Sequence, residues 1–368
     1  MSLDGESMPR PLKLGFLCPH NPWRRDSFSG TPYFMLAALQ AHPDVEVQVM
    51  GDHPKPRPWD GVQRRLGKQP ANPFPDVPDD SGLDAIIALT AFTELERFGD
   101  RLQAPVFYVT DSTTKFLREF FNVDMPSDKE EREAQVIEKA CWTVFSSQYM
   151  VDRAQVELGT RIGDRVSVIP FGANLQHIPA EAMRKPAMPP VRLLFIGKNW
   201  EVKGGDVAVA TVAALRDRGH AAQLTVIGTA PARLKQHPDI IALGHLSKDR
   251  RRDMARLEQA LREAHLFILP TQADCTPIVV SEANAFGCPV LISDVGGVGS
   301  LIQEGQNGYL MPLDAPAEAY ADRIEKLVTD PAVYTQLSQS SQTIVQTHLN
   351  WTLWAERMAS LIREKATA

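Results

Sequence analysis

Glu282 is the side chain whose chemistry is most constrained by its neighbours. It lies in the segment 271–290, TQADCTPIVVSEANAFGCPV, which predicts a short helix: Thr276 is a suitable N-cap, Pro277 suits the first turn and Gly287 suits the end. The helix is apolar on almost every side and is therefore expected to be buried. A buried carboxylate costs several kcal/mol unless hydrogen-bond donors or a cation meet it. A hydroxyl-rich ligand such as a ribose would supply donors, and an internal arginine would supply a cation.

Two nearby features could bind an anion. The N–H groups of Ile278 and Val279 lie at the start of the expected helix, where backbone donors have no partner within the helix. Lys198 and Lys203 lie on the segment 195–205, FIGKNWEVKGG, which follows a strand and precedes a helix. Two cations on such a loop could neutralise a diphosphate. The simpler interpretation of the two lysines is a solvated surface pair.

The elements that must position these residues alternate between strands and helices in two successive series. Such alternation is typical of parallel sheets with helices on both faces, an α/β doubly wound architecture. In the first series we expect strands at 12–18, 45–50, 85–89, 105–109, 142–146 and 166–170 and helices at 31–40, 112–121 and 129–140. In the second series we expect strands at 191–196, 223–227, 265–270 and 290–293 and helices at 206–218, 248–264 and 277–286.

The length of 368 residues is too great for one ordinary domain. We expect a first domain at 9–180 and a second at 190–347, joined by the proline-rich stretch 179–190. A last helix at 351–365 could return to complete the first domain. Open parallel sheets bind ligands at the carboxyl ends of their strands, so two such domains predict a binding cleft between them.

Composition and motifs disfavour several functions. A net charge of −6 is unlike that of a general nucleic-acid binder, and no apolar run is long enough to cross a bilayer. The glycine run 296–299 lacks the spacing of a dinucleotide fingerprint, which disfavours a dehydrogenase. No Asp-x-Asp motif ends a strand, so no metal site is expected. Four cysteines without CxxC spacing indicate reduced thiols and a cytoplasmic protein, whose oligomeric state the sequence does not indicate.

The second half of the chain resembles the retaining family 4 glycosyltransferases, which have the GT-B fold of two facing Rossmann-like domains with a cleft between them. That family has a Gly-Arg loop followed by Glu-x-Lys-Gly, and this chain has Gly197-Lys198 and then EVKG at 201–204. The family also has two glutamates separated by seven residues and then Gly-x-Pro-Val. Here Asp274, seven residues, Glu282 and GCPV at 287–290 stand in that order.

The resemblance runs from about residue 166 to residue 354, with further matches at 294–297 and 304–308 and weaker ones at 28–32 and 109–111. It implies transfer of a hexose-type sugar from a nucleoside-diphosphate sugar to a hydroxyl, with retained anomeric configuration. Neither a metal nor another cofactor is implied. The acceptor could be a saccharide, a lipid-linked compound or a small molecule.

The resemblance also assigns residues to parts of the donor. Glu282 would hold the ribose, Lys198 and Lys203 the diphosphate, and Asp274 the hydroxyls of the transferred sugar. The remaining implied contacts are made largely by backbone. They are phosphate and sugar contacts around Thr276, Ile278 and Val279, base contacts around Thr229 and 244–246, which includes Leu246, and a loop with Gly30 that approaches the phosphates across the cleft.

Two residues depart from the family pattern. Asp274 replaces the usual Glu and is one methylene shorter, so the sugar must lie closer or carry different hydroxyls. Lys198 replaces the usual Arg and keeps the charge without planar bidentate binding. Both substitutions keep the sign of the charge, but they make it harder to infer the identity of the donor from the family.

Asp111 has two interpretations, which can coexist. It follows the strand 105–109 at a place where many relatives carry a histidine near the reacting sugar. It also precedes the expected helix 112–121, and aspartate is a favoured N-cap.

Other activities on the same fold remain as alternatives: a nucleotide-sugar epimerase, a sugar phosphorylase, or a non-catalytic nucleotide-sugar-binding protein. A basic segment at 53–68, with Lys55, Arg57, Arg64, Arg65 and Lys68, could face an anionic acceptor or the edge of a membrane at the inner face. The simpler interpretation of that segment is a solvated loop.

Overall fold

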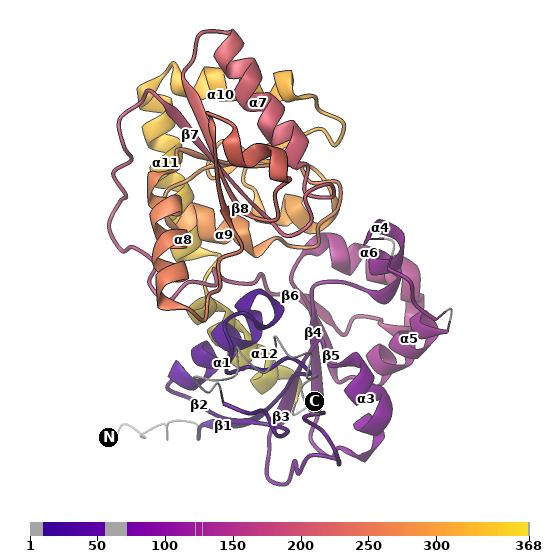
Figure 1. The fold of residues 1–368 in the computed structure, drawn as a ribbon. Helices are drawn as coiled ribbons and strands as arrows, with labels where there is room; N and C mark the ends of the chain where they lie inside the picture. Colours follow the sequence, from indigo (N-terminus) through magenta and orange to yellow (C-terminus); the bar gives the residue numbers. More distant parts are fainter. Residues whose placement is uncertain (1–9, 56–71, 122, 127, 367–368) are drawn as a thin grey trace, which may run out of the picture.

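The computed structural model describes residues 10–55, 72–121, 123–126 and 128–366. They form two α/β domains, each built on a six-stranded sheet with helices on both faces (Figure 1). Most of the basic segment predicted at 53–68 lies outside the described residues. Within the part of the chain that the structure describes, no helix is long and apolar enough to cross a membrane.

The N-terminal sheet is parallel throughout and has the strand order β2-β1-β3-β4-β5-β6. Its strands are β1 (Leu12–Leu17), β2 (Val45–Val49), β3 (Ala85–Leu89), β4 (Val106–Thr110), β5 (Trp142–Phe145) and β6 (Val166–Val168). The central strand β3 is AIIAL and is buried along its whole length, as expected for a parallel strand covered on both faces. Leu14 of β1 pairs with Val47 on one side and Ala85 on the other.

Helices from both ends of the chain cover this sheet. The helices that follow its strands are α1 (Thr31–Ala41), α3 (Phe92–Phe98), α4 (Thr114–Phe121), α5 (Lys129–Lys139) and α6 (Gln148–Leu158). The last helix, α12 (Trp351–Lys365), lies beside α1 (Figure 1). Its Trp354, Met358 and Ile362 are buried in the same hydrophobic cluster as Met35 and Leu39 of α1. The helix α12, which follows the C-terminal domain in the chain, therefore packs against the N-terminal domain.

The C-terminal sheet is also parallel and has the order β12-β11-β10-β7-β8-β9. Its strands are β7 (Val191–Gly197), β8 (Ala222–Gly228), β9 (Ile240–Gly244), β10 (Leu266–Leu269), β11 (Val290–Ser293) and β12 (Gly308–Met311). Its helices are α7 (Gly205–Asp217), α8 (Arg251–Glu263), α9 (Ile278–Ala285), α10 (Ala317–Val328) and α11 (Pro331–Thr347). The two edge strands β9 and β12, and the helices α10 and α11, are absent from the sequence-based expectation.

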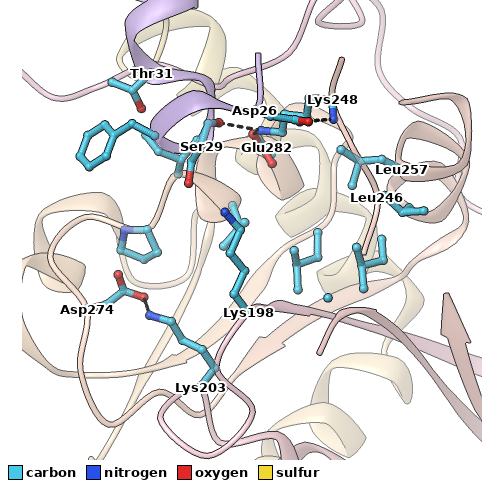
Figure 2. Close-up of a pocket in the computed structure, with 18 of the residues that line it drawn as sticks. Asp26, Ser29, Thr31, Lys198, Lys203, Leu246, Lys248, Leu257, Asp274 and Glu282 are labelled. Carbon is cyan, nitrogen blue, oxygen red and sulfur yellow. Dashed lines mark hydrogen bonds and ion pairs between the residues drawn. The ribbon is translucent and has the colours of Figure 1, made fainter. Parts of the chain in front are cut away.

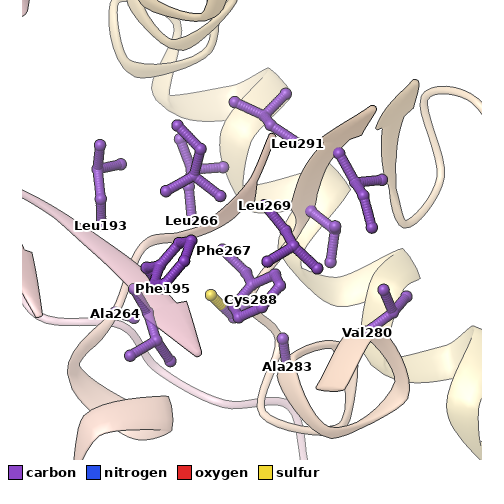
Figure 3. Close-up of a cluster of buried hydrophobic side chains, with 14 of the residues drawn as sticks. Leu193, Phe195, Ala264, Leu266, Phe267, Leu269, Val280, Ala283, Cys288 and Leu291 are labelled. Carbon is purple, nitrogen blue, oxygen red and sulfur yellow. The ribbon is translucent and has the colours of Figure 1, made fainter. Parts of the chain in front are cut away.

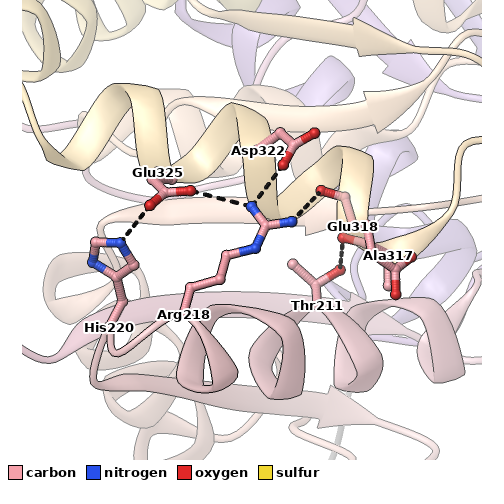
Figure 4. Close-up of polar contacts among 7 residues, drawn as sticks. All are labelled: Thr211, Arg218, His220, Ala317, Glu318, Asp322 and Glu325. Carbon is pink, nitrogen blue, oxygen red and sulfur yellow. Dashed lines mark hydrogen bonds and ion pairs between the residues drawn. The ribbon is translucent and has the colours of Figure 1, made fainter.

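Two sets of contacts hold this domain together. Phe195, Phe267 and Leu291 come from three neighbouring strands and form one buried cluster with Val280 of α9 (Figure 3). At the surface, Arg218 at the end of α7 donates to Asp322 of α10 at 2.6 Å and to Glu325 at 3.2 Å (Figure 4). Because Val280 belongs to this buried cluster, α9 is held against the sheet. The position of α9 in turn sets the position of its first turn.

Candidate functional site

A cavity of about 510 Å³ lies between the two domains and is lined by residues of both. Asp26 and Ser29 come from the N-terminal domain, and Lys198 and Lys203 are among those from the C-terminal domain (Figure 2). Asp111, another lining residue, also comes from the N-terminal domain. Lys198 and Lys203 follow the end of β7, Asp111 follows β4 and Asp274 follows β10. The cavity therefore opens at the carboxyl ends of strands from both sheets, and its volume suits a small-molecule ligand.

The loop after β7 holds its two lysines in different surroundings. Gly204 has a φ of +70° and precedes α7, and a Cβ at this position would lie 1.9 Å from the carbonyl oxygen of Pro270. Only glycine fits there, so the loop passes close against β10. This approach lets Lys203 Nζ reach Asp274 Oδ2 at 2.5 Å and the carbonyl oxygen of Ala273 at 3.1 Å. Lys198 is exposed and lines the cavity.

The first turn of α9 faces the same cavity. Ile278 and Val279 line it, and N–H groups in the first turn of a helix have no intrahelical acceptor. The prediction that Thr276 caps this helix is wrong. Pro277 occupies the N-cap position, and Thr276 Oγ1 is hydrogen-bonded to Ser146 Oγ of the N-terminal domain at 2.8 Å. Thr276 therefore joins the two domains beside the helix start, and its side chain does not cap the N–H groups of Ile278 and Val279, which can face an anion, whereas the Val280 N–H donates to the carbonyl oxygen of Pro277 at 3.0 Å.

Glu282 is 1% exposed, as the apolar character of its helix predicted. Burial raises the pKa of its carboxyl, and the positive charge of Lys248 opposes that rise. Lys248 Nζ forms an ion pair with Glu282 Oε1. The internal cation that the sequence analysis considered is thus present, but it is a lysine rather than an arginine.

Lys248 lines the cavity and is not among the site residues that the sequence predicts. The sequence predicts a helix at 248–264 whose first residue is Lys248, whereas α8 begins at Arg251 and Lys248 lies in the turn before it. From that turn the Lys248 side chain reaches the cavity, which Leu257 of α8 also lines. The only sequence signal was a polar stretch, SKDR at 247–250, between an apolar strand and an amphipathic helix.

Asp111 does not cap α4, so the N-cap interpretation is wrong. The helix begins at Thr114, and Thr113 Oγ1 accepts a hydrogen bond from Phe116 N at 3.1 Å. The Asp111 carboxylate instead lines the cavity and accepts a hydrogen bond from Ser112 Oγ at 3.3 Å. Burial raises the pKa of Asp111 to about 6, and the nearby Asp274 carboxylate adds to this effect. The two acids are therefore close enough to interact.

The loop that precedes α1 approaches the cavity from the N-terminal domain. Phe28, Ser29 and Gly30 have φ values of +44°, +58° and +96°. A Cβ at Gly30 would lie 2.8 Å from the carbonyl oxygen of Arg25. Gly30 does not line the cavity, but its neighbours Ser29 and Thr31 do. Its role in the structure is to allow the sharp turn from this loop into α1.

The structure brings most of the residues predicted for the site to one cavity. Those that line it are Lys198, Lys203, Asp274, Glu282, Asp111, Leu246, Thr276, Ile278 and Val279. Gly30 and Thr229 do not. Thr229 is exposed and its N–H donates to the carbonyl oxygen of Gly197 at 3.0 Å. Ile227, His245 and Leu257 line the cavity next to Leu246.

Among the described residues, no group of three or more His, Cys, Asp or Glu side chains could hold a metal ion.

Residues 190–330 match the family model described as glycosyl transferases group 1. The D-inositol 3-phosphate glycosyltransferase of Nocardia farcinica is 31% identical over 223 residues, which cover 56% of this chain and 49% of that protein. The alpha-D-kanosaminyltransferase of Streptomyces kanamyceticus is 25% identical over 185 residues, which cover 47% of this chain and 45% of that protein. The chain thus spans about half the length of these curated relatives.

Solved structures resemble the chain over nearly its whole length. The sucrose-phosphate synthase of Thermosynechococcus elongatus has a TM-score of 0.65 at 16% identity, covering 96% of this chain and 99% of that chain. Anabaena HepE in complex with UDP-glucose has a TM-score of 0.60 at 17% identity, covering 96% of this chain and 100% of that chain. These similarities, with the two parallel sheets, confirm the predicted GT-B fold.

Proposed function

We propose that this chain, whose residues 190–330 match the group 1 glycosyl transferases, transfers a hexose-type sugar from a nucleoside-diphosphate sugar to a hydroxyl acceptor with retention of anomeric configuration. One observation carries the proposal. The buried Glu282 carboxylate, the first turn of α9 and the Lys198 and Lys203 side chains all line one cavity between the domains. A nucleoside-diphosphate sugar has ribose hydroxyls that match the carboxylate and phosphates that match the helix start and the two lysines.

The diphosphate is already a good leaving group, so the main chemical task is to stabilise the charge that develops on it. Lys198 and Lys203 supply two positive charges, and the N–H groups of Ile278 and Val279 supply dipoles at a helix start. Groups fixed in advance around a developing negative charge lower the barrier more than they strengthen binding of the ground state. We therefore propose transfer without a metal ion.

Asp274 and Asp111 would meet the transferred sugar and the incoming acceptor. Asp274 forms an ion pair with Lys203, and Asp111 lines the cavity from the N-terminal domain. An acceptor hydroxyl would enter from the Asp111 side, and a saccharide, a lipid-linked compound or a small molecule could carry it. The proposed location is the cytoplasm, where the four cysteines, all free thiols in the structure, would stay reduced.

The first experiment is a thermal-shift screen against UDP-, GDP-, ADP- and dTDP-sugars, followed by calorimetric titration of any nucleotide that stabilises the protein. UDP is the first choice because the Anabaena HepE structures contain UDP, with glucose or as UDP-glucose. We expect at least one nucleotide to raise the melting temperature, since a ligand that binds only the folded state stabilises it. No shift with any of the four would contradict the proposal.

Product analysis separates the proposed activity from its alternatives. Transfer requires an acceptor and gives a product whose anomeric proton coupling by NMR matches that of the donor. An epimerase would convert the donor without an acceptor, and a phosphorylase would need inorganic phosphate. A non-catalytic binding protein would bind the donor without even slow hydrolysis.

A further inference from the structure

Lys248 contacts both domains at once. Its ammonium pairs with Glu282 of α9 in its own domain and donates to the carbonyl oxygen of Ser29, in the loop before α1, at 3.2 Å (Figure 2). Its backbone N–H donates to Asp26 Oδ1 of the same loop at 2.6 Å. The Lys248 side chain is 15% exposed and that of Glu282 is 2% exposed, so this bridge is largely shielded from water.

The residues on either side of Lys248 hold the same loop. Ser247 Oγ donates to Asp26 Oδ2, and Asp249 Oδ1 accepts from the Arg25 N–H at 2.8 Å. Asp249 also forms an ion pair with Arg24 at 2.8 Å. Residues 24–29, here called the docking loop, are therefore attached to the turn 247–249 across the cleft through side chains and backbone.

The docking loop has a backbone that needs such support. Phe28 and Ser29 are not glycines, yet both have φ in the left-handed region. L-residues adopt that region at a cost, so contacts elsewhere must hold the loop in place. The contacts to 247–249 cross from one domain to the other, and they can form only when the domains are close together.

We propose that Lys248 is a positioning residue that couples donor binding to docking of this loop. The proposal rests on the proposed function, because it takes Glu282 as the group that receives the ribose hydroxyls. A carboxylate can accept from hydroxyls and from an ammonium at the same time, since its two oxygens offer several lone pairs. Lys248 then neutralises the buried charge of Glu282 while the same ammonium, together with Asn174 Nδ2 at 3.1 Å, donates to the Ser29 carbonyl at the edge of the cavity.

The coupling arises because one ammonium, that of Lys248, contacts both Glu282 and the carbonyl oxygen of Ser29. If Lys248 leaves Glu282, its ammonium also moves away from the position in which it reaches Ser29. If the docking loop lifts away, Glu282 loses the support that directs Lys248 towards it. Ribose binding at Glu282 and loop docking should therefore favour each other, as two events linked by a shared group do.

The test compares Lys248→Met, Lys248→Arg and the exposed-lysine control Lys235→Met in the full chain. UDP affinity is measured by calorimetry, and GDP, ADP and dTDP are titrated in the same way. We expect Lys248→Met to weaken binding of the nucleotide at least tenfold, Lys248→Arg to recover part of the loss, and Lys235→Met to bind like the wild type. Hydrogen exchange of the peptide covering 24–30 is followed with and without saturating nucleotide. We expect nucleotide to slow exchange in the wild type and to have little effect in Lys248→Met.

Nucleotide affinity of Lys248→Met that equals or exceeds that of the wild type would overturn the proposal. It would mean that Lys248 occupies Glu282 in place of the ribose and must leave before the nucleotide binds. A wild type that binds none of the four nucleotides would instead overturn the proposed function. Because Lys248→Met leaves a buried carboxylate without a cation, the variant could unfold. The double variant Lys248→Met/Glu282→Gln is then compared with Glu282→Gln alone, and equal exchange at 24–30 in the two would also overturn the proposal.

Discussion

Lys203 and Asp274 form an ion pair in the cavity, with Nζ 2.5 Å from Oδ2. Their side chains are 19% and 12% exposed, so water weakens this pair less than it weakens a surface pair. The sequence analysis assigned the lysine to the diphosphate and the acid to the sugar. The structure joins the two groups, so a phosphate that approaches Lys203 must share it with Asp274. The position of the sugar and that of the leaving group are thereby linked.

Lys203→Ala should lower kcat/KM for the donor by about 100-fold or more, because the ammonium acts most strongly as negative charge builds on the leaving phosphate. Binding of the free nucleoside, which has no phosphate, should change little. Steady-state kinetics of donor turnover and calorimetry with the nucleoside provide the two measurements. Lys235→Ala, at an exposed lysine away from the cavity, is the matched control. Equal losses for nucleoside binding and donor turnover would contradict this role.

Asp274→Glu keeps the charge and adds one methylene, so the carboxylate should extend further into the space for the sugar. We expect the ratio of kcat/KM for two epimeric sugar donors with the same nucleotide to change by about tenfold, the scale on which small changes in a pocket alter specificity. The affinity for the free nucleoside diphosphate should stay within about twofold, since the base and ribose contacts are untouched. An unchanged ratio would mean that Asp274 serves only to hold Lys203.

Asp111 provides a pH-dependent test. Burial raises its pKa to about 6 in the folded protein, whereas an exposed aspartate has a pKa of about 4. The folded state therefore binds the proton more tightly than the unfolded state, and the stability due to this group falls as pH rises from about 4 through about 6. Asp111→Asn cannot ionise and should escape that loss.

Thermal melting of Asp111→Asn and the wild type at pH 4.5, 6 and 8 measures this effect. The variant should melt about 2–4 °C above the wild type at pH 4.5, where the unfolded Asp111 is already mostly ionised, and several degrees further above it at pH 8, since about 1 kcal/mol corresponds to 2–4 °C in a protein of such domain size. Glu133, whose pKa burial raises to about 7, is present in both proteins, so its titration cancels in the difference. A difference that does not vary with pH would show that Asp111 titrates normally.

Local patterns predict part of the fold and part of the cavity lining. The apolar helix around Glu282 predicted its burial because almost every neighbouring side chain is apolar. The loop with Gly204 could be placed after a strand because glycines and charges interrupt the apolar run there. Such features depend on residues that are close in sequence, so periodicity and turn chemistry are sufficient to find them.

The errors arose where distant segments decide the outcome. Thr113 rather than Asp111 caps α4, and Glu133 of α5 accepts from the Thr114 N–H at 2.6 Å. Asp and Thr are both good caps, so the sequence alone could not choose between them. Lys248 meets Asp26, a residue 222 positions away in the chain. That contact exists only because the two domains face each other.

A chelator should leave turnover nearly unchanged. Lys198, Lys203 and the start of α9 can neutralise the leaving diphosphate, and Asp274, the nearest carboxylate to Lys203, is already paired. The measurement is donor turnover after EDTA treatment and desalting, with and without added Mg²⁺ or Mn²⁺. Complete loss of activity on chelation that either ion restores would overturn the metal-independent mechanism.

Glu282→Gln tests the ribose contact with the smallest possible change of shape. The amide keeps one acceptor oxygen but loses the charge, so UDP, or whichever nucleotide the screen identifies, should bind about 1–3 kcal/mol more weakly. The fold should survive, because the neutral amide needs no cation and Lys248 can still donate to the amide oxygen and to the carbonyl oxygen of Ser29, which it reaches at 3.2 Å.

Calorimetry and thermal melting of Glu282→Gln are compared with Glu318→Gln, a substitution at an exposed glutamate on α10. The control should match the wild type in both measurements. Glu282→Gln should match it in melting temperature to within a few degrees but not in nucleotide affinity. The reverse pattern, early melting with normal nucleotide binding, would mean that the pair with Lys248 serves stability alone and that the ribose is held by another group.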